Sequence, residues 1–281
     1  MQDVDVGADD QAVRADQETY THGHAASVLR SHASRTVANS AAYLTPWLRP
    51  GTRVLDVGCG PGTITVDMAA IVAPGQVVGI EPTSGPLVDA QAHAEQAGAT
   101  NVTFAVGDVY ALDIADDSFD VVHAHQVLQH LGDPVAALRE MLRVCKPGGV
   151  VAARDADYAA MTWFPAEPRL DRWLEVYRAV AHGNGAEPDA GRRMLAWANA
   201  AGASDVTPSA SVWCYATPGE RAWWGGMWAE RILTSAITRQ ALDGGYADEA
   251  ELQAISAAWR EWAAGDDGWF AIIHGEIICH P

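Results

Sequence analysis

The stretch RVLDVGCGPGTIT, residues 53–65, constrains the fold of this chain more than any other. An apolar run leads into a turn that holds glycine at alternate positions, namely Gly58, Gly60 and Gly62, and a helix-like apolar pattern follows. Glycine adopts positive φ at little cost, and without a Cβ it lets the backbone close against a ligand. The N–H groups that begin the following helix add a partly positive end. The stretch therefore predicts a strand, a ligand-binding turn and a helix.

An acidic residue closes the next apolar run. Residues 76–80 lead into Glu81, which stands nineteen residues beyond Gly62. A carboxylate at the tip of the neighbouring strand can accept both hydroxyls of a ribose. The glycines are spaced G-x-G-x-G after Asp56, whereas dinucleotide sites have G-x-G-x-x-G. An adenosine-like cofactor is expected, and a nicotinamide dehydrogenase is disfavoured.

This motif resembles that of the class I S-adenosylmethionine-dependent methyltransferases, in their small-molecule and quinone-methylating subgroup. Residues 119–151, FDVVHAHQVLQHLGDPVAALREMLRVCKPGGVV, resemble the family's fourth strand, helix and Pro-Gly-Gly turn into strand five. Residues 18–48 resemble an N-terminal segment found in methyltransferases of fungal and bacterial specialised metabolism. The resemblance implies S-adenosylmethionine as the cofactor.

The resemblance also implies which residues hold that cofactor. Glu81 would hold the ribose, Asp108 would reach the adenine amino group, and Arg35 would pair with the methionine carboxylate. The full set of expected cofactor residues is Tyr20, Arg35, Asp56, Gly58, Cys59, Gly60, Gly62, Glu81, Pro82, Asp108, Val109, His125 and Gln126.

Strand-like and helix-like runs alternate through the first half of the chain. Strands are expected at residues 53–57, 76–81, 102–106, 119–123 and 149–154, with helices at 63–72, 85–97 and 134–144. This alternation predicts a doubly wound, Rossmann-like α/β fold with a parallel sheet. Because parallel strands end at one edge, Gly58, Glu81, Asp108 and His125 are expected to converge there.

The second half is expected to complete the sheet. Helices are predicted at residues 169–182, 191–201, 218–239 and 247–264, and strands at 205–216 and 268–279. The resemblance implies a seven-stranded, mostly parallel sheet whose last strand is antiparallel. Residues 218–264 would then form a helical insertion between strands six and seven.

The expected domain organisation is a mobile start followed by one domain. Residues 1–17 carry five aspartates among small residues and are expected to be mobile. Residues 18–281 would form a single methyltransferase domain. Within it we expect an N-terminal helical lid at 18–50, a cofactor-binding core at 51–155 and a helical cap at 218–264.

Charge and composition exclude several function classes. The formal net charge is −18, which disfavours nucleic acid and anionic lipid as partners. The apolar runs fall short of the ~18 residues that a membrane span needs. The chain opens without a basic segment and apolar core, and its four cysteines are scattered, so a cytoplasmic location is expected. The expected partner is a small-molecule methyl acceptor, with no nucleic acid and no membrane, and a homodimer is left open.

Methyl transfer from a sulfonium needs alignment above all, and a base only when the acceptor holds its proton tightly. Histidine is the usual base at neutral pH. The candidate catalytic residues are His125, after the predicted fourth strand, and His24, in the predicted lid. The alternatives are an idle ring at His125 and a surface loop at His24. Two pairs of histidines are separated by one residue, His22 with His24 and His123 with His125. Neither pair has further ligands at a fixed spacing, so no metal is expected.

Eleven tryptophans suggest an aromatic wall around the acceptor. Such walls offer large apolar contact area and attract cations through their ring faces. The candidate substrate-binding residues are Asp155, Tyr158, Trp163, Trp224 and Trp228. The alternatives are core packing for the aromatic residues and a solvated loop for Asp155.

The function predicted from the sequence is methyl transfer to an oxygen or nitrogen atom of a small aromatic or hydrophobic molecule, in specialised metabolism. Two alternatives remain open. One is a quinone-type C-methyltransferase, which the motifs between residues 54 and 149 also resemble. The other is a protein that binds the cofactor without methyl transfer, as a sensor or a cyclase, because a fold does not dictate a reaction.

Overall fold

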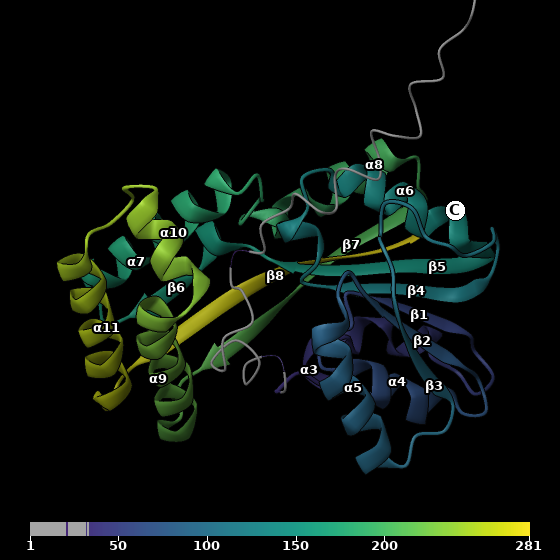
Figure 1. Cartoon of the computed structure of the whole chain (residues 1–281), viewed down its shortest axis with the longest axis horizontal. Helices are drawn as coiled ribbons and strands as arrows, with labels where there is room; N and C mark the ends of the chain where they lie inside the picture. The colour runs from purple at the N-terminus through teal and green to yellow at the C-terminus, as the bar shows by residue number, and fades with distance from the viewer. Residues whose placement is uncertain (1–20, 22–31, 33) are drawn as a thin grey trace, which may run out of the picture.

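A parallel sheet forms the first half of the molecule (Figure 1). The computed structural model describes Thr21, His32 and residues 34–281. Five strands pair in parallel in the order β3-β2-β1-β4-β5. They are β1 (Val54–Val57), β2 (Val77–Glu81), β3 (Val102–Val106), β4 (Phe119–His125) and β5 (Cys145–Ala156). The connecting helices are α4 (Thr63–Val72), α5 (Ser84–Ala97) and α6 (Pro134–Val144). The predicted alternation of strands and helices is confirmed.

The antiparallel edge of the sheet also follows the prediction. Strand β8 (Trp269–His280) runs antiparallel to β5 on one side and to β7 (Ser204–Tyr215) on the other. The order β3-β2-β1-β4-β5-β8-β7 confirms the Rossmann-like fold with an antiparallel last strand. A short strand, β6 (Thr162–Phe164), pairs with the beginning of β8 and was not predicted. Three residues are too few for an alternating pattern to show in the sequence.

Each face of the sheet has its own hydrophobic core, because successive strand residues point to opposite faces. Val54 and Val77 pack under α3 (Val37–Ser40), η1 (Ala42–Trp47) and α4. Leu55 and Val122 pack under α6 and α8 (Met194–Ala201) on the other face. Helix α6 shows why such a helix forms: the Asp133 carboxylate accepts from Ala136 N–H at the N-terminus, and Pro134 occupies its first turn.

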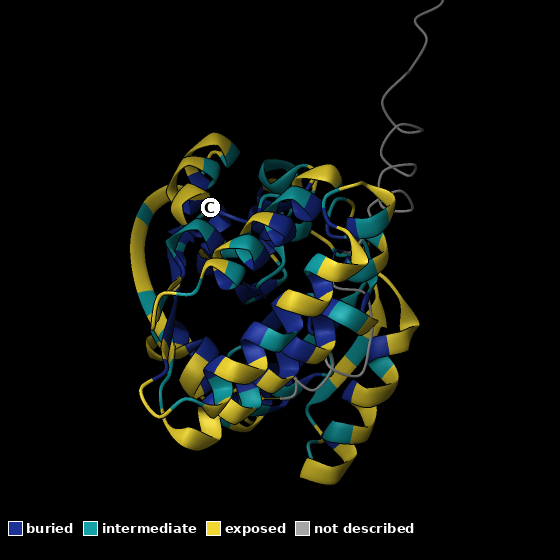
Figure 2. Cartoon of the chain, turned by 90° about the vertical axis from the view of Figure 1, so that its left-hand side faces the viewer, coloured by how far each residue is buried: buried dark blue, intermediate teal, exposed yellow. Residues whose placement is uncertain are grey.

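The helical insertion consists of α9 (Pro218–Thr234), α10 (Ala236–Asp243) and α11 (Glu249–Ala264), between β7 and β8. Together with α7 (Pro168–Gly183) it covers the end of β8 that projects from the sheet (Figure 1). Figure 2 looks onto this end of the molecule, where the helices show buried faces turned inward and exposed faces turned outward. Trp173, Trp228 and Trp259 are fully buried at its centre.

One predicted helix is two helices in the structure. The sequence pattern predicted a continuous helix over residues 218–239, but the chain breaks at Ser235, whose backbone is extended (φ −97°, ψ −179°). Serine favours such breaks because its side chain competes with helical hydrogen bonding. The prediction was wrong at this point, and the insertion folds back on itself as a result.

The remaining described elements are short 3₁₀ turns: η2 (Leu128–His130), η3 (Tyr158–Ala160) and η4 (Ala190–Arg193). The predicted mobile start at residues 1–17 lies outside the described residues, and so do residues 18–20, 22–31 and 33 of the predicted lid at 18–50. Within the described part of the chain, none of the helices combines the length and the apolar character that crossing a membrane would require.

Candidate functional site

A cavity of about 860 Å³ lies at the carboxyl ends of the parallel strands. One part, the glycine-turn half, is lined by the loops that follow β1 to β4 and by His32 and Arg35. The other part, the aromatic half, is walled by β7, the turn after β5 and helix α9, with the residues Tyr158, Met161, Tyr215, Trp223, Trp224, Trp228 and Arg231. Strand direction explains the first part, because parallel strands bring their carboxyl ends to one edge.

The three glycines of the turn all have left-handed backbone conformations, with φ of 66° at Gly58, 55° at Gly60 and 76° at Gly62. Their surroundings differ. A Cβ at Gly58 would run into the side chain of Val127, and one at Gly62 would lie 2.9 Å from the Ala90 Cβ. At Gly60 the nearest atom would be His32 Nδ1, 3.9 Å away. Gly60 therefore leaves open space above the turn, into which a ligand can come.

Gly62 does not line the cavity, so its expected contact with the cofactor is corrected. It is the N-terminal cap of α4, and its left-handed backbone lets α4 begin directly behind the turn. Its role in the structure is close packing of α4 against α5.

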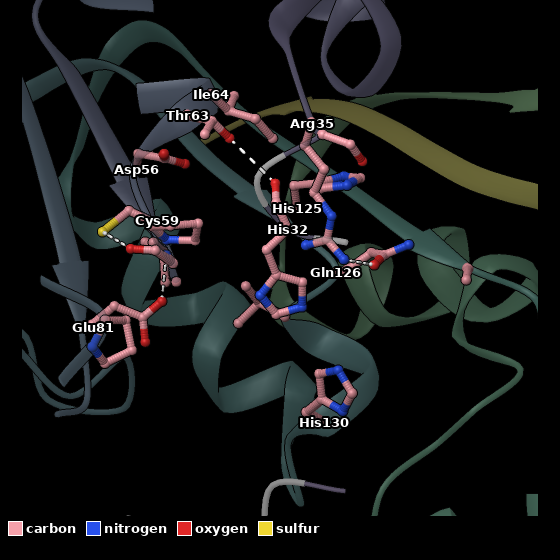
Figure 3. Close-up of a pocket in the computed structure, with 18 of the residues that line it drawn as sticks. His32, Arg35, Asp56, Cys59, Thr63, Ile64, Glu81, His125, Gln126 and His130 are labelled. Carbon is pink, nitrogen blue, oxygen red and sulfur yellow. Dashed lines mark hydrogen bonds between the residues drawn. The ribbon is translucent and has the colours of Figure 1, made fainter. Parts of the chain in front are cut away.

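Glu81 stands at the end of β2, next to the turn. Its Oε1 accepts a hydrogen bond from the Gly60 N–H at 2.5 Å (Figure 3). Burial raises the pKa of this carboxyl from an ordinary value of 4.5 to about 7, partly offset by that hydrogen bond. A partly buried carboxylate at this position is well suited to a diol, which would supply two donors.

Asp56 reaches the cavity wall, but both its oxygens already have protein partners. Oδ1 lies 2.7 Å from His123 Nδ1, and Oδ2 accepts from the Thr65 hydroxyl at 2.6 Å. The carboxylate thus ties the end of β1 to β4 and to α4. The cavity is also lined by four other expected cofactor residues, namely Cys59, Pro82, Asp108 and Val109.

Arg35 lies on the other side of the glycine turn from Glu81 (Figure 3). Its Nη2 donates to Gln126 Oε1 at 2.5 Å, and Gln126 Nε2 lies 3.0 Å from His274 Nε2. Gln126 has φ of 54°, an uncommon conformation for a residue other than glycine, and its N–H donates to the Arg154 carbonyl at 2.7 Å. The glycine-turn half of the cavity thus has a carboxyl group on one side and a guanidinium on the other.

His125 lines the cavity with its ring, but neither ring nitrogen is accessible or has a hydrogen-bond partner among the described residues. Burial holds the pKa of His125 well below its usual value of 6.5, and the nearby charges of Arg35 and Arg154 lower it further. A general base needs a nitrogen that reaches the acceptor. The prediction that His125 is that base is therefore corrected, and the ring serves as a neutral part of the wall.

The expected roles of His24 and Tyr20 concern residues outside the described part of the chain. They stay predictions from the sequence.

The aromatic half contains three of the five expected substrate residues, Tyr158, Trp224 and Trp228. Tyr215 stacks on Trp224 with ring centroids 4.4 Å apart, and Trp223 tilts against both rings. The paired rings form a flat apolar wall, the surface that an aromatic or hydrophobic molecule prefers.

The other two expected substrate residues do not line the cavity. Trp163 lies on β6 and stacks on Phe270, with centroids 5.7 Å apart, inside the helical core. Asp155 is fully buried in β5, and its Oδ1 accepts from the Gln129 N–H at 3.1 Å. Both predictions are corrected for one reason: neighbouring residues of a strand point to opposite faces, and only the paired register decides which face meets the cavity.

Several cavity residues escaped the sequence prediction, among them His32, Thr63, Tyr215 and Arg231. A signal existed for Arg231. It follows Trp224 and Trp228 at the helical spacing i, i+4, i+7, so the three share one face of α9. His32 had no such signal, because its place above the turn depends on the path of the chain; its carbonyl lies 3.4 Å from the Thr63 hydroxyl.

Comparison with known proteins agrees with this geometry. Residues 48–203 match a family model described as a methyltransferase domain. The chain is 37% identical over 273 residues to an uncharacterised methyltransferase of Schizosaccharomyces pombe. The match covers 94% of this chain and 96% of the relative. It is 29% identical over 279 residues to a probable methyltransferase of Aspergillus luteorubrus, covering 92% and 96%.

Among solved structures, the YcgJ protein of Bacillus subtilis superposes with a TM-score of 0.54 at 20% identity, covering 84% of this chain and 96% of that one. At this identity the likeness concerns the fold. The matched domain, the full-length relatives and the cavity at the strand ends lead to one conclusion. The chain belongs to the class I S-adenosylmethionine-dependent methyltransferases, and S-adenosylmethionine is its cofactor.

Proposed function

We propose that this enzyme methylates an oxygen or nitrogen atom of a small aromatic or hydrophobic molecule, in specialised metabolism. The observation that carries the proposal is the continuity of the cavity, which joins the glycine turn to the wall formed by Tyr215, Trp223 and Trp224. Cofactor and acceptor would occupy one space with no protein between them. The resemblance of residues 18–48 to methyltransferases of specialised metabolism supports the broader role.

In this proposal the glycine-turn half holds the cofactor. Glu81 would accept the ribose hydroxyls, Gly60 leaves room for the ligand, and Asp108 would accept from the adenine amino group. Arg35, 2.5 Å from Gln126, would pair with the methionine carboxylate. S-adenosylmethionine, when bound, supplies an electrophilic methyl group.

The chain's own contribution is positioning and exclusion of water. Alignment of two reactants in a closed site can lower a barrier by roughly 7–11 kcal/mol. No base role is assigned to His125, whose nitrogens are buried. The proposed acceptors are therefore phenols and amines that lose a proton readily, since these gain least from a protein base.

The test is methyl transfer itself. The purified protein would be incubated with S-adenosylmethionine and panels of phenols, amines and quinols, with mass spectrometry used to detect a gain of CH₂ and NMR to locate the new methyl group. An O- or N-methylated product is expected. Methylation at carbon would support the quinone-type alternative. Tight S-adenosylhomocysteine binding with no product from any class would favour a sensor or cyclase and contradict the proposal.

A further inference from the structure

The turn that follows β4 shapes the cavity between its two halves. Gln126, Val127 and His130 belong to this turn and line the cavity, and Figure 3 shows Gln126 and His130 from this side. The turn includes the 3₁₀ segment η2, which has no side-chain cap of its own. Its conformation must therefore be set by contacts with the rest of the fold.

Those contacts come from the end of β5. The Gln126 N–H donates to the Arg154 carbonyl at 2.7 Å, and the Gln129 N–H donates to Asp155 Oδ1 at 3.1 Å. The Leu128 backbone lowers the pKa of the same carboxyl group. In return, Gln129 Oε1 accepts from the Ala156 N–H at 3.3 Å. Consecutive residues of β5 thus hold consecutive parts of the turn.

The same contacts orient the His130 ring. Because Gln129 Oε1 is the acceptor for Ala156, the amide NH₂ of Gln129 is the group that faces His130 Nε2, 3.0 Å away. Nε2 must then accept, which assigns the proton of the ring to Nδ1. Burial lowers the pKa of His130 to about 3, so the ring is neutral at any physiological pH.

We propose that Asp155 and Gln129 are positioning residues for cofactor binding: Asp155 holds the backbone of the turn after β4, and Gln129 sets the tautomer of His130 on the cavity wall. Neither residue lines the cavity itself. The inference goes beyond the proposed acceptor class and rests only on the cofactor site.

The choice of a carboxylate at residue 155 supports a functional role. Asp155 is fully buried, its Oδ2 has no partner among the described residues, and burial raises the pKa of the carboxyl to about 7. A neutral side chain of the same shape would avoid this desolvation penalty. Asp155 Oδ1 is the acceptor that the turn uses, so a side chain without this oxygen would leave the Gln129 N–H without its partner.

Asp157 provides a matched control. It is also a buried aspartate just beyond β5, but it forms a two-point ion pair with Arg192, at 2.7 and 2.8 Å, and does not line the cavity. The variants Asp155→Ala and Asp157→Ala would be compared with wild type by calorimetric titration of S-adenosylhomocysteine and by thermal unfolding without ligand.

The two variants are expected to separate affinity from stability. Asp155→Ala should weaken S-adenosylhomocysteine binding by about tenfold, the size of one lost hydrogen bond, because the Gln129 N–H no longer has its acceptor. Asp157→Ala should lower Tm and leave the affinity unchanged. Native affinity in Asp155→Ala, or an equal loss of affinity in both variants, would overturn the proposal.

A second measurement reports on Gln129 directly. The imidazole ¹⁵N shifts of His130, assigned by their loss in His130→Gln, should show the Nδ1–H tautomer in wild type and a mixture of tautomers in Gln129→Ala. An unchanged tautomer in Gln129→Ala would show that Gln129 does not set the tautomer of His130 and would overturn its role as a positioning residue. Failure of the wild type to bind S-adenosylhomocysteine would instead overturn the cofactor site, whereas a negative acceptor screen leaves this test unaffected.

Discussion

At the scale of single residues, two glycines allow the effect of a substitution on ligand binding to be distinguished from its effect on stability. Gly60 and Gly98 share a left-handed backbone, with φ of 55° and 65°. A side chain at Gly60 would project toward His32 and the cavity, whereas one at Gly98, the C-terminal cap of α5, would meet nothing within 4 Å. The backbone strain of substitution is therefore matched at the two positions, and only the effect on the ligand differs.

Gly60→Val is expected to abolish binding of S-adenosylmethionine, because the side chain fills the space that the turn leaves for it. Gly98→Val should show the same loss of stability, about 1–2 kcal/mol, from a left-handed valine. Titration calorimetry and chemical denaturation of both variants would test this. Near-native affinity in Gly60→Val would contradict the assigned pocket.

Glu81 makes cofactor binding depend on pH. Its pKa of about 7 in the free protein means that the carboxyl is largely protonated below neutrality. A ribose diol donates two hydrogen bonds and so favours the ionised form. The affinity for S-adenosylhomocysteine should therefore rise from pH 5.5 to pH 7.5 by roughly tenfold per unit below the pKa and level off above it, with a proton released on binding.

The stability of the free protein should change in the opposite direction. The folded pKa of Glu81 exceeds its ordinary value of 4.5, so its contribution to stability is fully present below pH 4.5 and is lost as pH rises through 7. Calorimetry in buffers of different ionisation enthalpy would measure the proton release. Glu81→Gln should bind more weakly with a flatter pH profile; a profile as steep as that of wild type would assign the titration to another group.

At the scale of elements, helix α9 depends on how it starts. Thr217 and Glu220 form a capping box: the Thr217 hydroxyl accepts from the Glu220 N–H at 3.4 Å, and Glu220 Oε2 accepts from the Thr217 N–H at 2.9 Å. The helix carries Trp223, Trp224 and Arg231 to the aromatic half. The capping box therefore fixes where α9 begins, and with it the position of the aromatic side chains that α9 carries.

Thr217→Ala is expected to destabilise the fold by about 1 kcal/mol, the usual value for a lost N-terminal cap. Thr234→Ala is the control on the same helix, because the exposed Thr234 hydroxyl only donates back to the Glu230 carbonyl and its loss should change stability by less than about 0.5 kcal/mol. Denaturant unfolding would compare the two variants. Equal effects would mean that the box does not stabilise α9.

At the scale of the whole molecule, the cavity lies where two separately built parts meet. The sheet has cores on both faces, and the helical insertion with α7 has a third, centred on buried tryptophans. Strands β7 and β8 run through both parts and join them (Figure 1). The first part supplies the glycine-turn half, and the second supplies most of the aromatic half.

The parallel sheet, the glycine turn and the cofactor could be predicted from local sequence patterns. Apolar runs, glycine spacing and an acid at the next strand end are local patterns, and the parallel topology brings them to one edge whatever the side chains elsewhere. Glu81, Gly60 and Asp108 were predictable for this reason.

The aromatic wall of the cavity and the contacts behind it depend on tertiary structure. Asp155 and Trp163 are close in sequence to residues that line the cavity, but they do not line it themselves. Both ring nitrogens of His125 are buried. Tyr215 faces the cavity because β7 pairs with β8 in the register that sets Tyr215 opposite Phe270. Which face of a strand meets a cavity depends on pairing between residues far apart in the chain, and no local pattern encodes that pairing.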